Sequence, residues 1–198
     1  MRGAVLGVGI NDARYVVSSG PRSNRLFCPY YKRWHDMLKR SYCPSYHLRQ
    51  PTYKDVTVCE EWKLFSVFRG WMEQQDWRGK ALDKDLLGEG KKLYSPRTCC
   101  FIPQGLNNLL ADGASIRGEF PRGVTYDKSR DKFMAKCSVD NRTKGLGRFD
   151  TAEDAEVAYL EFKAGLIEAR AVEQSDERVK ASLLAYASKL LRGVGHGK

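Results

Sequence analysis

The sequence predicts an α+β fold, with a helical N-terminal region and a strand–strand–helix (ββα) unit followed by a three-stranded antiparallel sheet packed on a helix, and a C-terminal helix. Two patterns favour this class. Apolar residues recur at helical spacing over 30–42, 61–75 and 151–171. Short alternating runs separated by turn residues fill 123–149. The 198 residues, 42% of them hydrophobic, are enough for one or two small domains.

The first predicted domain covers residues 1–112. The elements expected before its ββα unit are a short strand at 15–17, a helix at 30–42, a loop at 44–51, a short strand at 56–59 and a helix at 61–75. Aromatic residues recur on one side of both helices, which indicates that they belong to the core.

The ββα unit is predicted over residues 81–110. Its strands are expected at 81–87 and 99–102, with a polar turn at 88–92 between them. Pro103 is expected to open the helix, because proline suits a first helical turn. Residues 111–118 form the expected linker between the domains.

The second predicted domain covers residues 119–172. Three short strands are expected at 123–127, 132–139 and 143–149. Thr151 suits the N-cap of the following helix, and Asp154 supplies the acid of a capping box. Residues 173–198 are expected to form a further helix, at about 176–191, and a tail.

Charge is distributed unevenly along this basic chain, whose formal net charge is +10. Residues 122–148 hold eight Lys or Arg and three acids, whereas residues 150–177 hold nine acids and two basic residues. Separated signs predict a basic face, and a basic face predicts a polyanionic partner. The alternative is a solvated basic surface without a partner.

The six cysteines include no CxxC pair. No apolar run has the length of a membrane-spanning helix or of a signal-peptide core, so we expect a cytoplasmic protein with reduced thiols and no membrane partner. Ligand types that suit zinc occur at a non-standard spacing, and small buried side chains are the favoured interpretation of the cysteines. The residues of this weak zinc candidate are Cys28, His35, Cys43, His47 and Cys59.

The central strand of the second domain alternates between two kinds of residue. Lys132, Met134 and Lys136 are expected on an exposed face with Ser138, while Phe133 and its alternates pack on the helix. A sheet can enter the major groove of DNA, where Lys and Arg reach guanine edges and phosphates. The alternative is a set of edge lysines that only discourage aggregation. The same exposed basic face is expected to include Lys128, Arg130, Arg142, Lys144 and Arg148. Further candidate DNA-binding residues are Tyr126, Lys91 and Lys92.

The segment GVTYDKSRDKFMAKCSVDNRTKGLGRFDTAEDAEVAYLEFK resembles the ethylene-response-factor (Apetala-type) DNA-binding domain. The resemblance depends on the opening Gly-Val, the Lys-Phe-Met-Ala strand, the Leu-Gly-x-Phe motif and the Thr-x-x-Asp-Ala helix start. It implies that three strands lie in the major groove of duplex DNA and that the helix backs them. Phe133 stands where the family usually has tryptophan.

Residues 28–110 resemble the HNH-type, or homing, endonucleases of tailed phages, which implies a bacterial host cytoplasm. The matching pieces are Cys28-Pro-Tyr-Tyr, Trp34, Met37-Leu38, Tyr53, Val58-Cys-Glu-Glu-Trp62, Phe65, Phe68, Trp71-Met72, Leu82-Asp-Lys-Asp-Leu86, Tyr94-Ser-Pro, Cys99, Pro103 and Asn107. In such a site one Mg²⁺ or Mn²⁺ ion stabilises the charge that grows on the phosphate.

The resemblance assigns roles to individual residues of the ββα unit. Asp83 and Asn107 correspond to the metal ligands, with Asn108 as a substitute for Asn107. Lys84 stands at the position of the general base, where an ordinary lysine stays protonated and is a poor base. It is expected to hold a phosphate instead, with Asp85 as a further candidate catalytic residue.

Three hypotheses follow. The first is a metal-dependent DNA endonuclease that the C-terminal sheet delivers to duplex DNA. The second is a catalytically inactive DNA-binding regulator or inhibitor derived from such a nuclease. The third is a protein-partner role, in which the acidic helical surface after Asp150 contacts a basic protein or a second copy of the chain.

Overall fold

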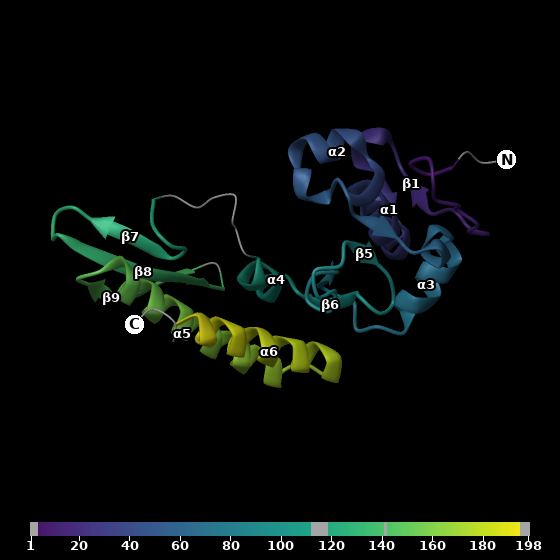
Figure 1. The fold of residues 1–198 in the computed structure, drawn as a ribbon. Helices are drawn as coiled ribbons and strands as arrows, with labels where there is room; N and C mark the ends of the chain where they lie inside the picture. Colours follow the sequence, from purple (N-terminus) through teal and green to yellow (C-terminus); the bar gives the residue numbers. More distant parts are fainter. Residues whose placement is uncertain (1–3, 112–118, 141, 195–198) are drawn as a thin grey trace. The chain divides into compact units, whose positions relative to one another are not determined.

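The computed structural model describes residues 4–111, 119–140 and 142–194 (Figure 1). The chain divides into two compact units, Met1–Ile102 and Pro103–Lys198. Helices and small sheets alternate along it, which confirms the α+β class. In the described part of the chain, no helix combines the length and the apolar character needed to cross a bilayer. The predicted linker lies almost wholly outside the described residues.

The first unit is built from short elements around one aromatic core. They are β1 (Ser18–Ser19), β2 (Leu26–Phe27), α1 (Pro29–Tyr42), α2 (Pro44–Arg49), β3 (Thr57–Val58), α3 (Phe65–Glu73), β4 (Lys80–Asp83), β5 (Leu93–Tyr94) and β6 (Cys100–Pro103). Strands pair as β1–β2, β3–β5 and β4–β6. Trp34 and Phe65 are almost fully buried, and the Trp34 indole Nε1 donates to the Trp62 carbonyl oxygen at 2.7 Å. The aromatic residues at helical spacing therefore form core, as predicted.

Two sequence predictions in the first unit are wrong. The expected loop at 44–51 contains helix α2, which Pro44 opens in its first turn. The expected helix at 61–75 is broken at Leu64, between a 3₁₀ turn (Glu60–Lys63) and α3. Leu64 is extended because it bridges Ile10, and the Phe65 amide donates to the Ile10 carbonyl at 3.0 Å. A long-range pairing overrides the local helical pattern here.

Two expected strands also differ from the structure. The first strand expected in the predicted ββα unit ends at Asp83 rather than at Leu87, because the Asp83 side chain starts a turn. At the N-terminus, the short strand lies at Ser18–Ser19 instead of 15–17, where it pairs with β2.

The second unit begins with α4 (Gln104–Leu110), the helix predicted after Pro103. Its sheet has the order β7–β8–β9, with antiparallel strands β7 (Val124–Asp127), β8 (Lys132–Val139) and β9 (Arg142–Phe149). The helices α5 (Ala152–Val172) and α6 (Glu177–Val194) follow and pack against each other (Figure 1). Thr151 Oγ1 accepts the Asp154 amide at 3.1 Å, which confirms the predicted cap.

Helix α5 covers one face of the sheet at very short range. Val124 and Ala135 from the sheet are buried with Ala155 and Tyr159 from the helix. A Cβ atom on Gly123 would lie 2.2 Å from the Tyr159 ring, and Gly123 has φ +79°. Glycine is therefore required at this point by both the contact and the backbone conformation.

Gly123→Ala is expected to lower the free energy of unfolding by about 2–4 kcal/mol. The new methyl group would clash with the Tyr159 ring, and alanine would have to adopt a left-handed backbone conformation. The matched control is Gly165→Ala in α5, where a Cβ meets no atom within 4 Å. That control is expected to raise stability by about 1 kcal/mol, since alanine is the better helix former. Chemical denaturation followed by circular dichroism measures both. Similar effects of the two substitutions would contradict the proposed Gly123–Tyr159 contact.

Candidate nucleic-acid interface

One face of the three-stranded sheet is not covered by α5. Along β8, Ala135 and Cys137 are buried towards the helix, whereas Lys136 and Ser138 retain exposed surface. This confirms the predicted alternation. Strand pairing extends it across the sheet, because directly paired residues share a face. We call this uncovered side the open face; its residues are Thr125, Asp127, Lys132, Met134, Lys136, Ser138, Thr143, Gly145 and Arg148.

The expectation that Arg142 and Lys144 lie on this face is wrong. Lys144 pairs with the buried Cys137, and its Nζ lies 4.6 Å from the centre of the Phe162 ring in α5. The cause is a β-bulge opposite Ala135 and Lys136, where Leu146 is the extra residue and packs into the core. One extra residue moves every side chain beyond it to the other face, so Arg142 and Lys144 lie on the helix side.

Two arginines at one end of the sheet share a single carboxylate. Asp127 lies 3.3 Å from an Arg130 nitrogen and 3.5 Å from Arg148 Nε. A hydrogen bond from the Ser129 hydroxyl contributes most to lowering the pKa of Asp127 to about 2, and the Arg130 guanidinium lowers it further. Both arginine side chains are about half exposed, so their outer nitrogens stay accessible to a phosphate.

Other basic residues of this region differ in their pairing. Lys132 forms an ion pair with Asp150, which follows β9. Across the described residues, Lys128 and Lys136 form no ion pair with a carboxylate. Lys136 thus offers its charge to a partner at the centre of the open face.

Helix α5 places acidic residues on the opposite side of the sheet, where Glu153, Glu161 and Glu168 are exposed. Arg142 and Lys144 lie on that side as well. Within the open face, three cations stand beside one carboxylate. This excess of positive charge attracts a polyanion to the open face.

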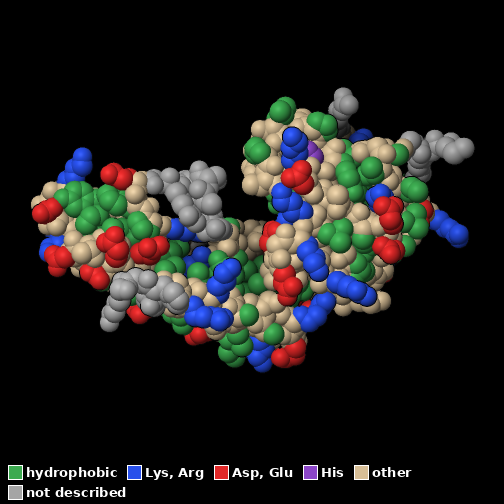
Figure 2. Space-filling view, in the orientation of Figure 1, with side chains coloured by type: hydrophobic (Ala, Val, Ile, Leu, Met, Phe, Trp, Pro, Cys, Tyr) green, Lys and Arg blue, Asp and Glu red, His purple; other side chains and the backbone are tan. Residues whose placement is uncertain are grey.

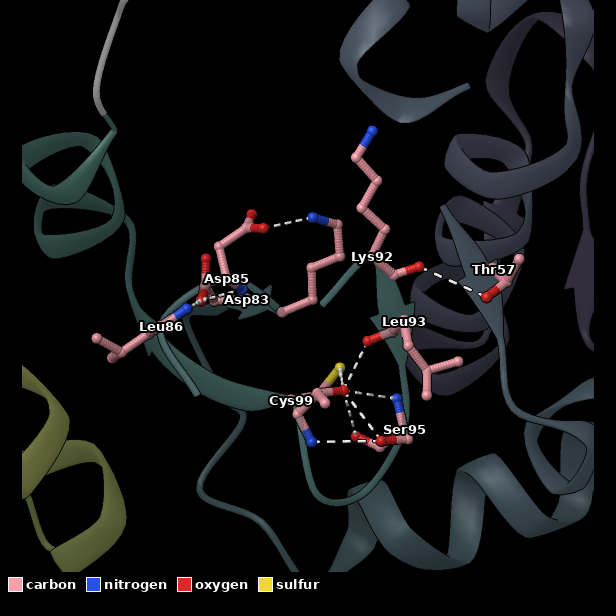
Figure 3. A network of polar contacts seen from close by, with 10 residues as sticks. Thr57, Asp83, Asp85, Leu86, Lys92, Leu93, Ser95 and Cys99 are labelled. Atoms are coloured by element: carbon pink, nitrogen blue, oxygen red, sulfur yellow. Dashed lines mark hydrogen bonds and ion pairs between the residues drawn. The ribbon is translucent and has the colours of Figure 1, made fainter. Parts of the chain in front are cut away.

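The cluster around Asp83 lies at the end of β4 in the first unit. Asp83 is buried, and its Oδ1 accepts the amides of Asp85 at 3.0 Å and Leu86 at 2.8 Å (Figure 3). Burial raises the pKa of Asp83. Lys84 is also buried; its Nζ donates to Asp85 at 2.5 Å and lies 5.5 Å from the Tyr53 ring centre. Asp83 and Lys84 thus both stabilise the turn that follows β4.

The residues that the resemblance pairs as metal ligands fall in different units. Asp83 belongs to the first unit, while Asn107 lies in α4 of the second, so their pairing stays a prediction. Within the described residues, no three His, Cys, Asp or Glu side chains are grouped as ligands for a metal ion. Asn108 accepts a hydrogen bond from Gln104 at 2.8 Å.

The residues of the zinc candidate have other partners. Cys43 contacts the Ser45 hydroxyl at 3.2 Å, and His47 Nε2 lies 2.8 Å from the Arg40 carbonyl oxygen. Burial raises the pKa of Cys59, which disfavours the thiolate that zinc needs.

The two lysines of the predicted turn at 88–92 lie at the surface of the first unit. Lys91 is exposed, and Lys92 forms an ion pair with Asp55 at 3.0 Å. The Lys92 carbonyl accepts the Thr57 amide at 2.9 Å and the Thr57 hydroxyl at 3.5 Å, and these bonds fix the turn against β3. Figure 3 draws the contact with the hydroxyl.

One group of aromatic residues was not predicted from the sequence. Phe120, Tyr126 and Phe133 lie together at the β7 edge of the sheet, with ring centres 5.1–6.3 Å apart. Tyr126 pairs with Phe133 and therefore lies on the side opposite the open face. The sequence offered one signal for this group: Phe120 and Tyr126 precede the basic turn at 128–131, and Phe133 follows it.

Comparison of the chain with protein-family models, with curated proteins and with solved structures finds no match.

Asp83→Asn is expected to raise the thermal midpoint at pH 7. In the unfolded chain the Asp83 carboxyl has a pKa of about 3.9. In the folded protein, burial raises this pKa. Ionisation of Asp83 therefore opposes folding as the pH rises above about 4. Asparagine removes the charge and keeps the oxygen that accepts both amides. The gain should disappear towards pH 3, and a lower midpoint for Asp83→Asn at pH 7 would contradict this account.

Proposed function

We propose that the chain binds double-stranded DNA, with the open face of the β7–β8–β9 sheet directed into the major groove. The observation that carries the proposal is the uncovered sheet face, with Lys136 on its central strand and Arg148 on the edge strand β9, opposite the helix α5 with its exposed glutamates. A sheet of this width fits the major groove, where lysine and arginine contact phosphates and guanine edges.

The open face offers both kinds of contact that a DNA-binding sheet needs. Lys136 and Arg148 supply positive charge, and Met134, paired directly with Arg148, supplies an apolar surface for a thymine methyl group. Lys128 and Arg130 extend the positive charge into the β7–β8 turn, where the phosphate backbone would pass. Binding is expected to weaken with salt, because each phosphate contact releases counterions.

Two matched lysine substitutions test which face binds. Lys136→Ala is expected to weaken duplex binding about tenfold and to reduce the salt slope by about one. Lys144→Ala, the same change on the helix side, is expected to leave the affinity within about twofold. Fluorescence anisotropy with a labelled duplex over a salt series measures both. Equal losses for the two variants would contradict the assignment of the open face.

Phosphodiester cleavage at the Asp83 cluster is a second candidate function. The observation that favours cleavage is the buried carboxyl of Asp83. Burial raises its pKa, and carboxyl groups with a shifted pKa are common at functional sites. The pairing of Lys84 with Asp85 favours the alternative, an inactive regulator or inhibitor, since a lysine held in this way is no general base. Binding of a protein partner or a second copy by the acidic α5 surface also stays a prediction.

Incubation of the protein with a plasmid and Mg²⁺ or Mn²⁺ separates cleavage from binding alone. A nuclease is expected to nick the plasmid, and Asp83→Asn, which keeps the turn, is expected to abolish the nicking. Intact plasmid with both metals, under conditions where the duplex is bound, would exclude cleavage and leave the DNA-binding proposal unaffected.

A further inference from the structure

The second unit has a hollow at the β7 edge of its sheet, and duplex binding by the open face does not use its aromatic wall. Its volume is 1240 Å³. Phe120, Tyr126 and Phe133 supply its aromatic wall, and Arg122, Lys128 and Arg130 are among the cations that line it. In Figure 2, apolar side chains gather at the surface over β7 and β8, with charged side chains around them.

The aromatic group differs from the core of the protein in its exposure. Trp34 and Phe65 are at most 1% exposed, whereas Tyr126 keeps 37% of its surface exposed. Its hydroxyl donates to Asp131, which fixes the orientation of the ring, and the ring is tilted by 47° against Phe133. The result is a rigid, solvent-facing aromatic surface, which is what base stacking requires.

The charge around the hollow is mixed. Its carboxylates are Glu119, Asp131 and Asp150, of which Asp131 accepts the Tyr126 hydroxyl and Asp150 pairs with Lys132. Arg130 pairs with Asp127 outside the hollow, and Lys128 is left for a phosphate. A ligand is therefore held mainly by stacking, with a small contribution from charge.

We propose that this hollow binds unpaired nucleotides of a single strand, with bases stacked on the Tyr126 and Phe120 rings and the backbone beside Lys128 and Arg130. Duplex bases hide their faces from a side pocket, while an unpaired strand presents them. The hollow exceeds the roughly 300–1,000 Å³ of small-ligand pockets, which favours a strand segment over a free mononucleotide.

Crossed substitutions separate this site from the open face. Fluorescence anisotropy with a short labelled oligothymidylate is expected to show that the parent protein binds the single strand. Tyr126→Ala is expected to weaken this binding about tenfold, since one stacked base contributes about 1–3 kcal/mol. Tyr126→Phe keeps the ring and is expected to retain binding. The same Tyr126→Ala variant should bind duplex within about twofold of the parent, whereas Lys136→Ala should weaken duplex and spare the single strand.

Three results would overturn the proposal. The first is no oligothymidylate binding by the parent protein. The second is equal single-strand affinity of the parent and Tyr126→Ala, with circular dichroism showing both folded. The third is competition by thymidine monophosphate as strong per molecule as by the strand, which would make this a mononucleotide site. The duplex proposal would fail separately, if Lys136→Ala leaves duplex affinity unchanged.

Discussion

The close approach of Tyr159 to Gly123 determines how the second unit presents its surfaces. A Cβ on Gly123 would lie 2.2 Å from the ring, so α5 packs directly on the sheet backbone at this point. Because α5 covers one face, the side chains of the other face stay in water, and the bulge at Leu146 decides which residues of β9 belong to each. Charge follows from this arrangement: Lys136 and Arg148 lie on the open side and the glutamates of α5 on the other.

The two proposals for the second unit rest on two different surfaces of its sheet, the open face and the β7 edge. The open face is basic and fits a duplex, whose phosphates are continuous and whose bases are read from the groove. The β7 edge is hollow and aromatic and fits unpaired bases. Lys128 and Arg130 lie in the turn between the two surfaces. A protein that contacts both a duplex and an unpaired strand would place the junction between them at this turn.

The regular parts of the fold were predictable from the sequence, and the parts set by long-range contacts were not. The strand pattern at 123–149 and the Thr151 cap gave the second unit correctly, because alternation and capping are local. Leu64 broke a predicted helix because it pairs with Ile10. Lys144 was assigned to the wrong face because the bulge at Leu146 shifts the alternation of β9. The glycines on either side of Leu146 were the local signal for this bulge. At the Asp83 cluster, the sequence did not indicate that Asp83 and Lys84 are buried or that the Asp83 carboxylate starts a turn, because both depend on how the rest of the first unit packs around them.

The central claim, that the open face binds DNA, is tested most directly by lysine footprinting. The protein would be acetylated under mild conditions with and without duplex DNA, and the modification at each lysine measured by mass spectrometry. The account predicts that DNA protects Lys136, while Lys144, on the helix side, and Lys180 and Lys189, on α6, stay as reactive as in the free protein. Protection of Lys144 and the α6 lysines, with Lys136 still reactive, would contradict it.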